Sequence, residues 1–491
     1  MKLEVNNENL LKIFNIVTIF LIISAVVLFL LNLKLNNYFI FFVLFLLFLS
    51  SSFVFLVKKD WIIYAIIAPL FLEADFFSFH FFGARIRIIQ IIEIVALICL
   101  IVRVTMSVSK LKKTPIDASL CGYILINFVA IINAPSVERS LKIAILLLSL
   151  ALLYYIIINF IDSKELFKKA FNLLLYIGLG EIIYGLYQVA AGMFNYYLGI
   201  GLPVGHRGIM HAGFINSPWG RPYGTFVEPD WYGAISMFFS LLFTSLYFSR
   251  LGEKKKFYLF GMVISILGMF LSFVRASWIG FLGSIFILLL LKHKVKLSRI
   301  NVINFSKFLL CLVVGFLILI ILIPATIDIF GTRVALTGVA GVGGTNVRFV
   351  QMRHSMNLFL NSPILGNGPG CFSVLGIWGH NEEYYNKLVR EGLISIERRY
   401  DPSIVTTVLA DTGILGAFFF IILLFSFFKY NLLTIPKIDG FYQVVSFSLL
   451  GGIVGLFISY IFTQGFWLPF TWVFIGFNIS AIKIGVLENK E

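Results

Sequence analysis

Residues 404–428 read IVTTVLADTGILGAFFFIILLFSFF, a run in which Asp411 is the single charged side chain before Lys429. An α-helix rises about 1.5 Å per residue, so about 20 apolar residues cross the roughly 30 Å hydrocarbon core of a bilayer. The run is long enough and apolar enough to do this. It therefore predicts a membrane-spanning helix.

Apolar runs of this kind recur along the whole chain of 491 residues, which is 59% hydrophobic and contains 54 Phe. The mean hydropathy is +0.96. This apolar content is higher than the core of a soluble protein could bury. We expect an all-α polytopic membrane protein with about 14 transmembrane helices and both termini in the cytoplasm. The expected spans begin near residues 12, 38, 61, 87, 118, 138, 165, 230, 256, 276, 305, 404, 441 and 466.

The expected span at residue 61 is the weakest, because its apolar part ends at Leu72, just before Glu73 and Asp75. It can equally be a re-entrant segment, which would invert the orientation of everything upstream. The first 31 residues are basic and then apolar, and they lack a small-residue cleavage site. This pattern favours a membrane anchor over a cleaved signal peptide.

The spans divide the chain into four regions. They are the N-terminal transmembrane helices (1–193), central helices with a first extracytoplasmic loop at 194–230 (194–325), a large extracytoplasmic loop (326–403) and the C-terminal transmembrane helices (404–491). Loops as long as these two are usually functional. We expect the larger loop to be partly helical, over 346–361 and 382–396, and to cap an outward-facing cavity. The sequence GNGPG at 366–370 is expected to form a tight turn between these helices.

The basic residues divide by type across this topology. About 24 of the 39 Lys and Arg face the cytoplasm and are nearly all Lys, whereas those that face outward are mostly Arg. Positive charge in cytoplasmic loops orients membrane proteins, so the net charge of +15 does not indicate nucleic acid as a partner. That rule does not favour Arg over Lys. A guanidinium group binds phosphate with two parallel hydrogen bonds, so outward-facing Arg predicts a phosphorylated substrate at the outer surface.

Metal and disulfide chemistry are not expected. Of the four cysteines only Cys371 falls outside the expected spans, so no extracytoplasmic disulfide can form within one chain. No CxxC motif or His/Cys pair stands at metal-ligand spacing. We therefore expect no metal and no cofactor.

Four segments together resemble a known family. They are RPYGTFVEPDWYG (221–233), SFVRASWIG (272–280), NVRFVQMRHSMNLFLNSPILGNGPGCF (346–372) and VLADTGILG (408–416). Their order, spacing and predicted side of the membrane resemble the O-antigen ligase and polymerase superfamily over roughly residues 60–480. The resemblance implies an integral-membrane glycosyltransferase of the GT-C type at the outer face of the cytoplasmic membrane. Such enzymes move a glycan from a polyprenyl diphosphate carrier to a sugar hydroxyl without a metal and with inversion.

The resemblance also implies site residues. Arg221 and Arg275 match the two essential arginines of the family, and Arg348 matches the arginine that opens its extracytoplasmic helix. Preorganised cations suit the negative charge that develops on a diphosphate leaving group. Each arginine also has a simpler interpretation. Arg221 could pair with Glu228 or Asp230, Arg275 could anchor the chain at the membrane interface, and Arg348 could be a solvated or helix-packing residue.

The candidate base departs from the family pattern. Ligases carry a His-Asn pair shortly before the late span, but here the corresponding stretch is Tyr400 to Ser403, with Asp401 as the nearest proton acceptor. Asp401 could act as the base, or it could cap the helix that follows Pro402. Histidines at 206, 211, 354 and 380 could also substitute in space. Alternatively, no protein base is needed, since the acceptor hydroxyl can lose its proton late to a diphosphate oxygen.

Further substrate-binding candidates are the polar and aromatic residues of the two long loops. They are Arg207, Glu228, His380, Trp219 and Tyr223, with Trp231, Trp378, Tyr384 and Tyr385 as additional aromatics that could stack on sugar rings. Tyr and Trp also form the ordinary belt at a membrane interface. Glu93, Glu181 and Asp411 are candidates because ionisable groups within spans are commonly functional.

Besides an assembly or scaffold role, three functions remain open at this point. The missing histidine favours a polymerase that joins two lipid-linked glycans over a ligase that transfers the glycan to a lipid A core or another acceptor. A lipid-linked glycan flippase is the non-enzymatic alternative, although basic residues are nearly absent from the middles of the expected spans. The expected partners are the polyprenyl-diphosphate-linked oligosaccharide, a glycan acceptor and the lipid bilayer, with other membrane proteins of polysaccharide assembly as further candidates.

Overall fold

A computed structural model describes residues 60–73, 78–81, 84–106, 110–193, 221–226, 228–249, 254–295, 345–377, 390 and 401–489. Within these ranges the regular secondary structure is helical apart from a two-stranded antiparallel hairpin of β1 (Ser78–Phe81) and β2 (Ala84–Arg87). The spans expected near residues 12, 38 and 305 lie outside the described residues, as does the helix expected over 382–396 except for Arg390.

The helices follow the expected spans closely. They are α3 (Asp60–Ile67), α4 (Ile88–Thr105), α5 (Asp117–Val129), α6 (Val137–Phe160), α7 (Lys164–Met193), α9 (Pro229–Phe248), α10 (Lys255–Leu271), α11 (Arg275–Val295), α14 (Thr345–Asn361), α15 (Phe372–Leu375), α17 (Ile404–Thr434), α18 (Gly440–Tyr460) and α19 (Pro469–Glu488), with short 3-10 helices η2 (Ala130–Asn133) and η6 (Ile435–Lys437). Helices α4 to α7, α9 to α11 and α17 to α19 each begin within three residues of an expected start.

Seven helices in the described part of the chain are long and apolar enough to cross a membrane, namely α4, α6, α7, α9, α17, α18 and α19. The chain is therefore a helical integral-membrane protein. The count of about 14 spans and the cytoplasmic placement of both termini stay predictions.

The described part of the segment after residue 60 is helix α3, which has 8 residues. A turn then leads to Glu73, which is 1% exposed and forms a 2.8 Å salt bridge with Arg87 at the end of β2. Whether this segment crosses the membrane or re-enters it stays a prediction. The hairpin was not expected from the sequence.

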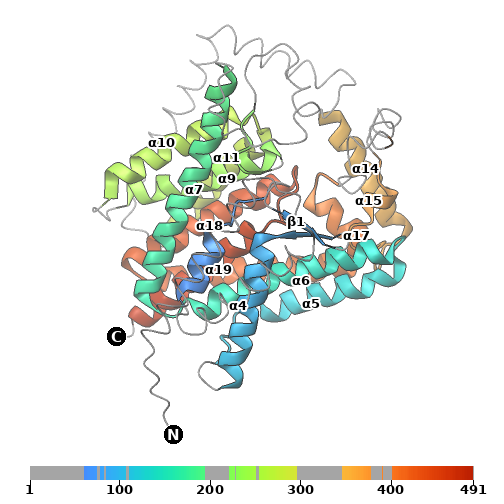
Figure 1. Cartoon of the computed structure of the whole chain (residues 1–491), viewed down its shortest axis with the longest axis horizontal. Helices are drawn as coiled ribbons and strands as arrows, with labels where there is room; N and C mark the ends of the chain where they lie inside the picture. The colour runs from blue at the N-terminus through green and yellow to red at the C-terminus, as the bar shows by residue number, and fades with distance from the viewer. Residues whose placement is uncertain are drawn as a thin grey trace, which may run out of the picture.

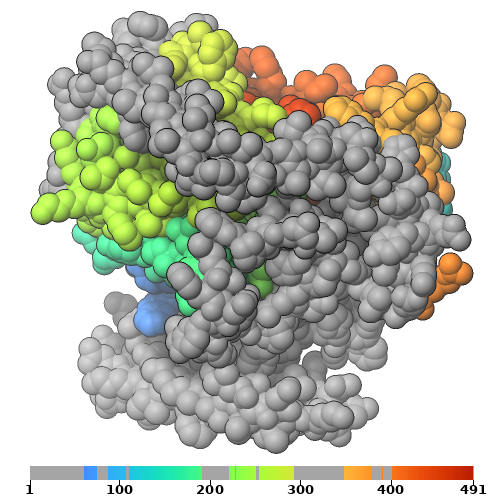
Figure 2. All heavy atoms as spheres, turned by 90° about the horizontal axis from the view of Figure 1, so that it is seen from above, coloured from blue at the N-terminus to red at the C-terminus, as the bar shows by residue number. Residues whose placement is uncertain are grey.

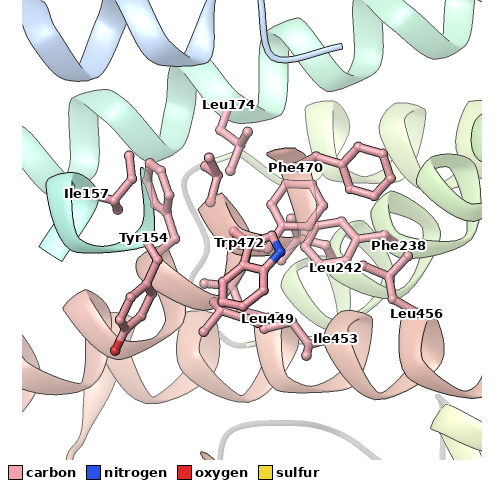
Figure 3. Close-up of a cluster of buried hydrophobic side chains, with 14 of the residues drawn as sticks. Tyr154, Ile157, Leu174, Phe238, Leu242, Leu449, Ile453, Leu456, Phe470 and Trp472 are labelled. Carbon is pink, nitrogen blue, oxygen red and sulfur yellow. The ribbon is translucent and has the colours of Figure 1, made fainter. Parts of the chain in front are cut away.

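The core lies where α9, α18 and α19 pack together, with α6 and α7 against α19. Figure 3 shows Trp472 and Phe470 of α19 among side chains of the neighbouring helices, with Phe238 of α9 close by. The rings of Phe238 and Phe474 stack with centroids 3.7 Å apart. Aromatic side chains thus fill the spaces between the helices, which accounts for much of the high Phe content.

Helix α17 is broken at Gly413, and the break receives the glycine turn that follows α14. Gly413 has φ 63° and ψ −159°, a conformation open essentially only to glycine. The amide N–H of Ile414 donates to Pro363 O at 2.8 Å, and that of Gly368 donates to Asp411 O at 2.9 Å. The predicted turn at 366–370 is confirmed, with its three glycines at positive φ. The hydrogen bonds of this turn hold the end of α14 against α17.

Helices α9, α10 and α11 form one group, while α14 and α15 lie beside α17 on the other side of the molecule (Figure 1). Seen from above, the yellow-green residues of α9 to α11 and the orange residues of α14 and α15 also lie on opposite sides of the molecule (Figure 2). Helix α18 packs against both α9 and α11. The first turn of α14 reaches this α9–α11–α18 group, as its contacts below show.

Candidate functional site

A cavity of about 220 Å³ lies where α9, α10, α11, α14 and α18 begin or end. It is lined by Arg221, Asp230, Phe273, Val274, Arg275, Ala276, Ile279, Arg348, Phe349, Met352 and Phe462. Arg221 and Arg275, which the family resemblance implies as site residues, both line this cavity. Arg348 joins them from a segment more than 70 residues further along the chain.

The segment that carries Arg221 is held in place by helix α7. Glu181 Oε1 accepts a 2.7 Å hydrogen bond from Thr225 N. Gln188 Oε1 accepts from Gly224 N at 2.8 Å, and Gln188 Nε2 donates to Gly224 O at the same distance. Gly224 has φ 60°, and a side chain there would collide with Glu181. Because α7 fixes both the backbone and its turn, Arg221 enters the cavity from a rigid support.

Arg221 makes two contacts that fix its guanidinium group. Its Nε donates to Ser272 O at 2.7 Å, and its Nη2 lies 3.3 Å from Asp230 Oδ1. Ser272 is the C-cap of α10, so the guanidinium group binds a carbonyl at the negative end of that helix. Burial lowers the pKa of Arg221 from its ordinary value, while the Asp230 carboxylate raises it. The ion pair thus offsets part of the cost of burying the arginine.

Arg348 lies in the first turn of α14 and makes the same kinds of contact. Its Nη1 donates to Phe462 O, just after the end of α18, and its Nη2 donates to Asp230 Oδ2. Its side chain is 35% exposed, compared with 17% for Arg221. Arg348 therefore joins α14 to the ends of two other helices while keeping part of its surface open.

Asp230 connects the two arginines. It lies in the first turn of α9, is 15% exposed, and engages a different arginine with each carboxylate oxygen. Two guanidinium groups around one carboxylate favour its ionised form. From the sequence, Asp230 was expected only as a partner of Arg221. Its bridging position was missed, because nothing in the local pattern places the start of α14 beside the start of α9.

Arg275 is the first residue of α11 and is exposed. A cation at a helix N-terminus opposes the helix dipole, whereas an anion there is favoured by about 0.3–1 kcal/mol. Just before it, Phe273 has φ 52°, the one positive φ at a non-glycine residue in the described ranges. This sharp turn brings Phe273, Val274 and Arg275 together into the cavity lining. The arrangement suits an anion bound between the helix terminus and the guanidinium group.

Asp401 lies elsewhere. It is 1% exposed, does not line the cavity, and its Oδ1 accepts a 3.0 Å hydrogen bond from Ser403 N at the N-cap of α17. Burial raises its pKa to about 6, and interactions with the hydroxyl groups of Ser355 and Thr406 lower it. The bond to Ser403 N forms an Asx turn that leads into the helix. This geometry favours the structural interpretation of Asp401, and its role as a base stays a prediction.

The other buried carboxylates have local partners. Asp411 accepts from Gly370 N at 2.9 Å and also contacts Cys371 N and Sγ, so it ties the glycine turn to α17. Glu93 accepts a 2.7 Å hydrogen bond from Ser149. Burial and Asp411 raise the pKa of the Cys371 thiol well above its usual range. None of these groups lines the cavity.

The remaining sequence candidates are only partly described. Glu228 and Tyr223 lie in the supported segment before α9 but do not line the cavity. Arg207, Trp219, His380, Trp378, Tyr384 and Tyr385 lie outside the described residues. The nitrogen of the Trp231 ring donates to Gln464 O at 2.6 Å. In the described part of the chain no group of three His, Cys, Asp or Glu residues could hold a metal ion.

Residues 260–421 match the sequence family described as O-antigen ligase. This range includes most of α10, all of α11 and α14, and more than half of α17. It therefore holds two of the three arginines of the cavity, Arg275 and Arg348. The resemblance to the O-antigen ligase and polymerase superfamily is confirmed by this match. No curated protein matches the chain.

Proposed function

We propose, from the O-antigen ligase domain at residues 260–421 and the cavity lined by three arginines, that this membrane protein is an inverting glycosyltransferase. It polymerises polyprenyl-diphosphate-linked oligosaccharide repeat units at the outer face of the cytoplasmic membrane and needs no metal. The observation that carries the proposal is the convergence of Arg221, Arg275 and Arg348 from three separate segments on one cavity.

In the reaction, an acceptor sugar hydroxyl attacks the anomeric carbon of the donor glycan. The new C–O bond forms as the bond from that carbon to the diphosphate oxygen breaks, and the lipid diphosphate leaves with the electron pair. Negative charge therefore grows on the leaving oxygen, and guanidinium groups placed in advance stabilise it most effectively. The hydroxyl proton leaves late, to a diphosphate oxygen, so the step balances without a base in the cavity lining.

Arg221 and Arg348 are fixed by helix-end carbonyls and by Asp230, so their positions do not depend on bound substrate. Arg275 stands at the start of α11, where an anion is favoured. We assign Arg221 and Arg275 to charge stabilisation on the leaving group and Arg348 to binding of the diphosphate. Asp401 is the candidate base if the acceptor requires one. Arg207, Glu228, His380, Trp219 and Tyr223 are proposed to contact the glycan.

A ligase that transfers the glycan to a lipid A core or another acceptor is the second candidate, favoured by the description of the matched family. The two functions share donor chemistry and differ in the acceptor. The absence of a His-Asn pair before α17, where Tyr400 to Ser403 stand instead, supports the polymerase.

The test is glycan transfer by the purified full-length protein in liposomes, with a polyprenyl-diphosphate oligosaccharide as the only substrate. A ladder of longer lipid-linked glycans, lost in Arg221→Ala and Arg275→Ala, would support a polymerase. Arg353→Ala is the matched control, because Arg353 is exposed on α14 and does not line the cavity. Transfer only after a lipid A core is added would support the ligase, and no transfer to either acceptor by folded protein would refute the enzymatic function.

A further inference from the structure

Asp230 is an unusual residue for a site that binds an anion. A carboxylate repels phosphate, yet Asp230 lines the cavity together with the three arginines. Its two oxygens are engaged by Arg221 and Arg348, so it cannot turn away without breaking both contacts. It is also only 15% exposed, which limits screening of its charge by water. The cavity lining therefore carries a fixed negative charge among its positive ones.

We propose that Asp230 sets the net charge of the cavity so that the site prefers a loaded carrier, whose diphosphate is esterified at both ends, over a spent carrier with a free terminal phosphate. This inference rests on the proposed function and adds to it a residue that determines specificity. The three guanidinium groups and one carboxylate of the lining give a net charge of about +2 at neutral pH, because Arg stays protonated and Asp ionised.

The charge of the ligand changes during the reaction. A diphosphate esterified by lipid and sugar carries about two negative charges, one on each phosphate. When the sugar leaves, the terminal phosphate gains a second ionisable oxygen with a pKa near 6, so the spent carrier carries nearly three negative charges at neutral pH. A lining of about +2 matches the loaded carrier. The extra charge of the spent carrier meets the Asp230 carboxylate without a further cation to compensate it.

This charge balance addresses a problem of product release. A site with three unopposed cations would stabilise the leaving diphosphate strongly and would then retain it. A fixed carboxylate among the cations weakens binding of the more highly charged product more than binding of the substrate. Because one additional unit charge interacts with one carboxylate at short range in a partly dry cavity, we expect a preference on the order of tenfold.

Alignment of the arginines is the alternative role for Asp230. Removing an aligning residue would weaken both ligands to a similar degree. Removing a charge-setting residue would instead change the ratio of the two affinities, and would favour the spent carrier. The ratio is therefore the quantity that separates the two roles.

The experiment measures binding of two probes to the full-length protein in nanodiscs. The probes share one polyprenyl chain and end in a free diphosphate or in a diphosphate esterified with a hexose. We expect Asp230→Asn to shift the affinity ratio toward the free diphosphate by about tenfold and to strengthen product inhibition by the free diphosphate in the transfer assay. Asp439→Asn is the matched control, since Asp439 stands at the other end of α18 and is exposed. It should leave the ratio unchanged.

Asp230→Glu provides a second test that does not require loss of the charge. It should keep the wild-type ratio even if both affinities fall. An unchanged ratio in Asp230→Asn, or a changed ratio in Asp230→Glu, would overturn the inference. If the wild-type protein transfers glycan but Asp230→Asn leaves the ratio unchanged, only this inference fails; if the wild-type protein binds neither probe, the proposed function fails with it.

Discussion

Replacing Arg221 with Lys and with Ala separates the charge of this residue from its geometry. Lys keeps one positive charge, but it presents a single ammonium group where the guanidinium group binds Ser272 O and Asp230 through different nitrogens. Ala removes both the charge and the contacts. We therefore expect graded losses of activity, smaller for Arg221→Lys than for Arg221→Ala.

The contacts of Arg221 give the expected magnitudes. Loss of one preorganised donor at a developing negative charge costs about 2.7–4 kcal/mol, or about 10²–10³ in kcat, and this is the expectation for Arg221→Ala. A hydrogen bond that involves a charged group contributes about 1.5–3 kcal/mol. Because the 3.3 Å contact with Asp230 is long, and because Lys can keep one of the two contacts, we take the lower value for Arg221→Lys. That corresponds to about a tenfold loss in kcat.

The assay is transfer from the polyprenyl-diphosphate oligosaccharide in liposomes, with kcat and KM measured separately and the thermal midpoint recorded as a test of folding. Arg353→Lys and Arg353→Ala serve as controls on the exposed face of α14. Wild-type activity in Arg221→Lys would show that the fixed fork of donors is not needed. Wild-type activity in Arg221→Ala, from protein with a normal thermal midpoint, would refute the assignment of this cavity as the catalytic site.

Three further predictions concern Arg275, Gly413 and Asp401. Arg275→Ala should lower kcat by about 10²–10³, because Arg275 lines the cavity at the start of α11. Unchanged kcat in Arg275→Ala, from protein with a normal thermal midpoint, would contradict this. Gly413→Ala should lower the free energy of unfolding by at least about 1–3 kcal/mol, since φ is 63° and a Cβ would lie 2.4 Å from Ile364 O; Gly180→Ala, where a Cβ meets nothing within 4 Å, is the control in a thermal-shift measurement. Asp401→Asn should raise the free energy of unfolding by about 2–3 kcal/mol at pH 7 and by little at pH 4. Burial raises the pKa of Asp401 to about 6 in the folded state, against about 3.9 in the unfolded chain. The stabilising contribution of the protonated carboxyl is therefore present below pH 4 and is lost as the pH rises through 6. Equal shifts at both pH values would argue against that titration, and wild-type kcat in Asp401→Asn would argue against a catalytic base at this position.

The helices could be predicted from the sequence because a lipid bilayer restricts which backbone structures can cross it. In a bilayer the backbone must satisfy its own hydrogen bonds, so each long apolar run becomes a helix with ends near the charged residues that flank it. This is why α17 begins at Ile404 and α18 within one residue of the expected start. The hairpin of β1 and β2 carries a signal of its own, because apolar and polar residues alternate in both four-residue strands, SFHF and ARIR. An expectation built on long apolar runs overlooks so short an alternation. The position of the hairpin depends on tertiary contacts such as the Glu73–Arg87 salt bridge.

The site was predictable to the extent that the family resemblance and side-chain chemistry identified it. Arg221 and Arg275 stood out because they match the two essential arginines of the family, and because outward-facing guanidinium groups suit a phosphorylated substrate. Asp230 did not, because a carboxylate at the start of a helix already has an ordinary explanation in the helix dipole. Its role depends on Arg348, which comes from a helix 115 residues or more after it in the chain. Such a pairing is set by how α14 docks on α17, and no local pattern reports that packing.

The lining of the cavity also bears on the kind of phosphate that it would bind. Six of its residues are large and apolar, namely Phe273, Val274, Ile279, Phe349, Met352 and Phe462, and they stand beside the three arginines. A soluble phosphate would make no favourable contact with these apolar side chains, and it would lose part of its hydration by lying beside them. A lipid diphosphate carries a charged group next to a hydrocarbon chain, so it can satisfy both parts of the lining at once. The apolar residues would also keep water away from the guanidinium groups, where each unit of charge then acts more strongly on the leaving oxygen. The same composition thus supports both the class of substrate and the means of stabilising its departure.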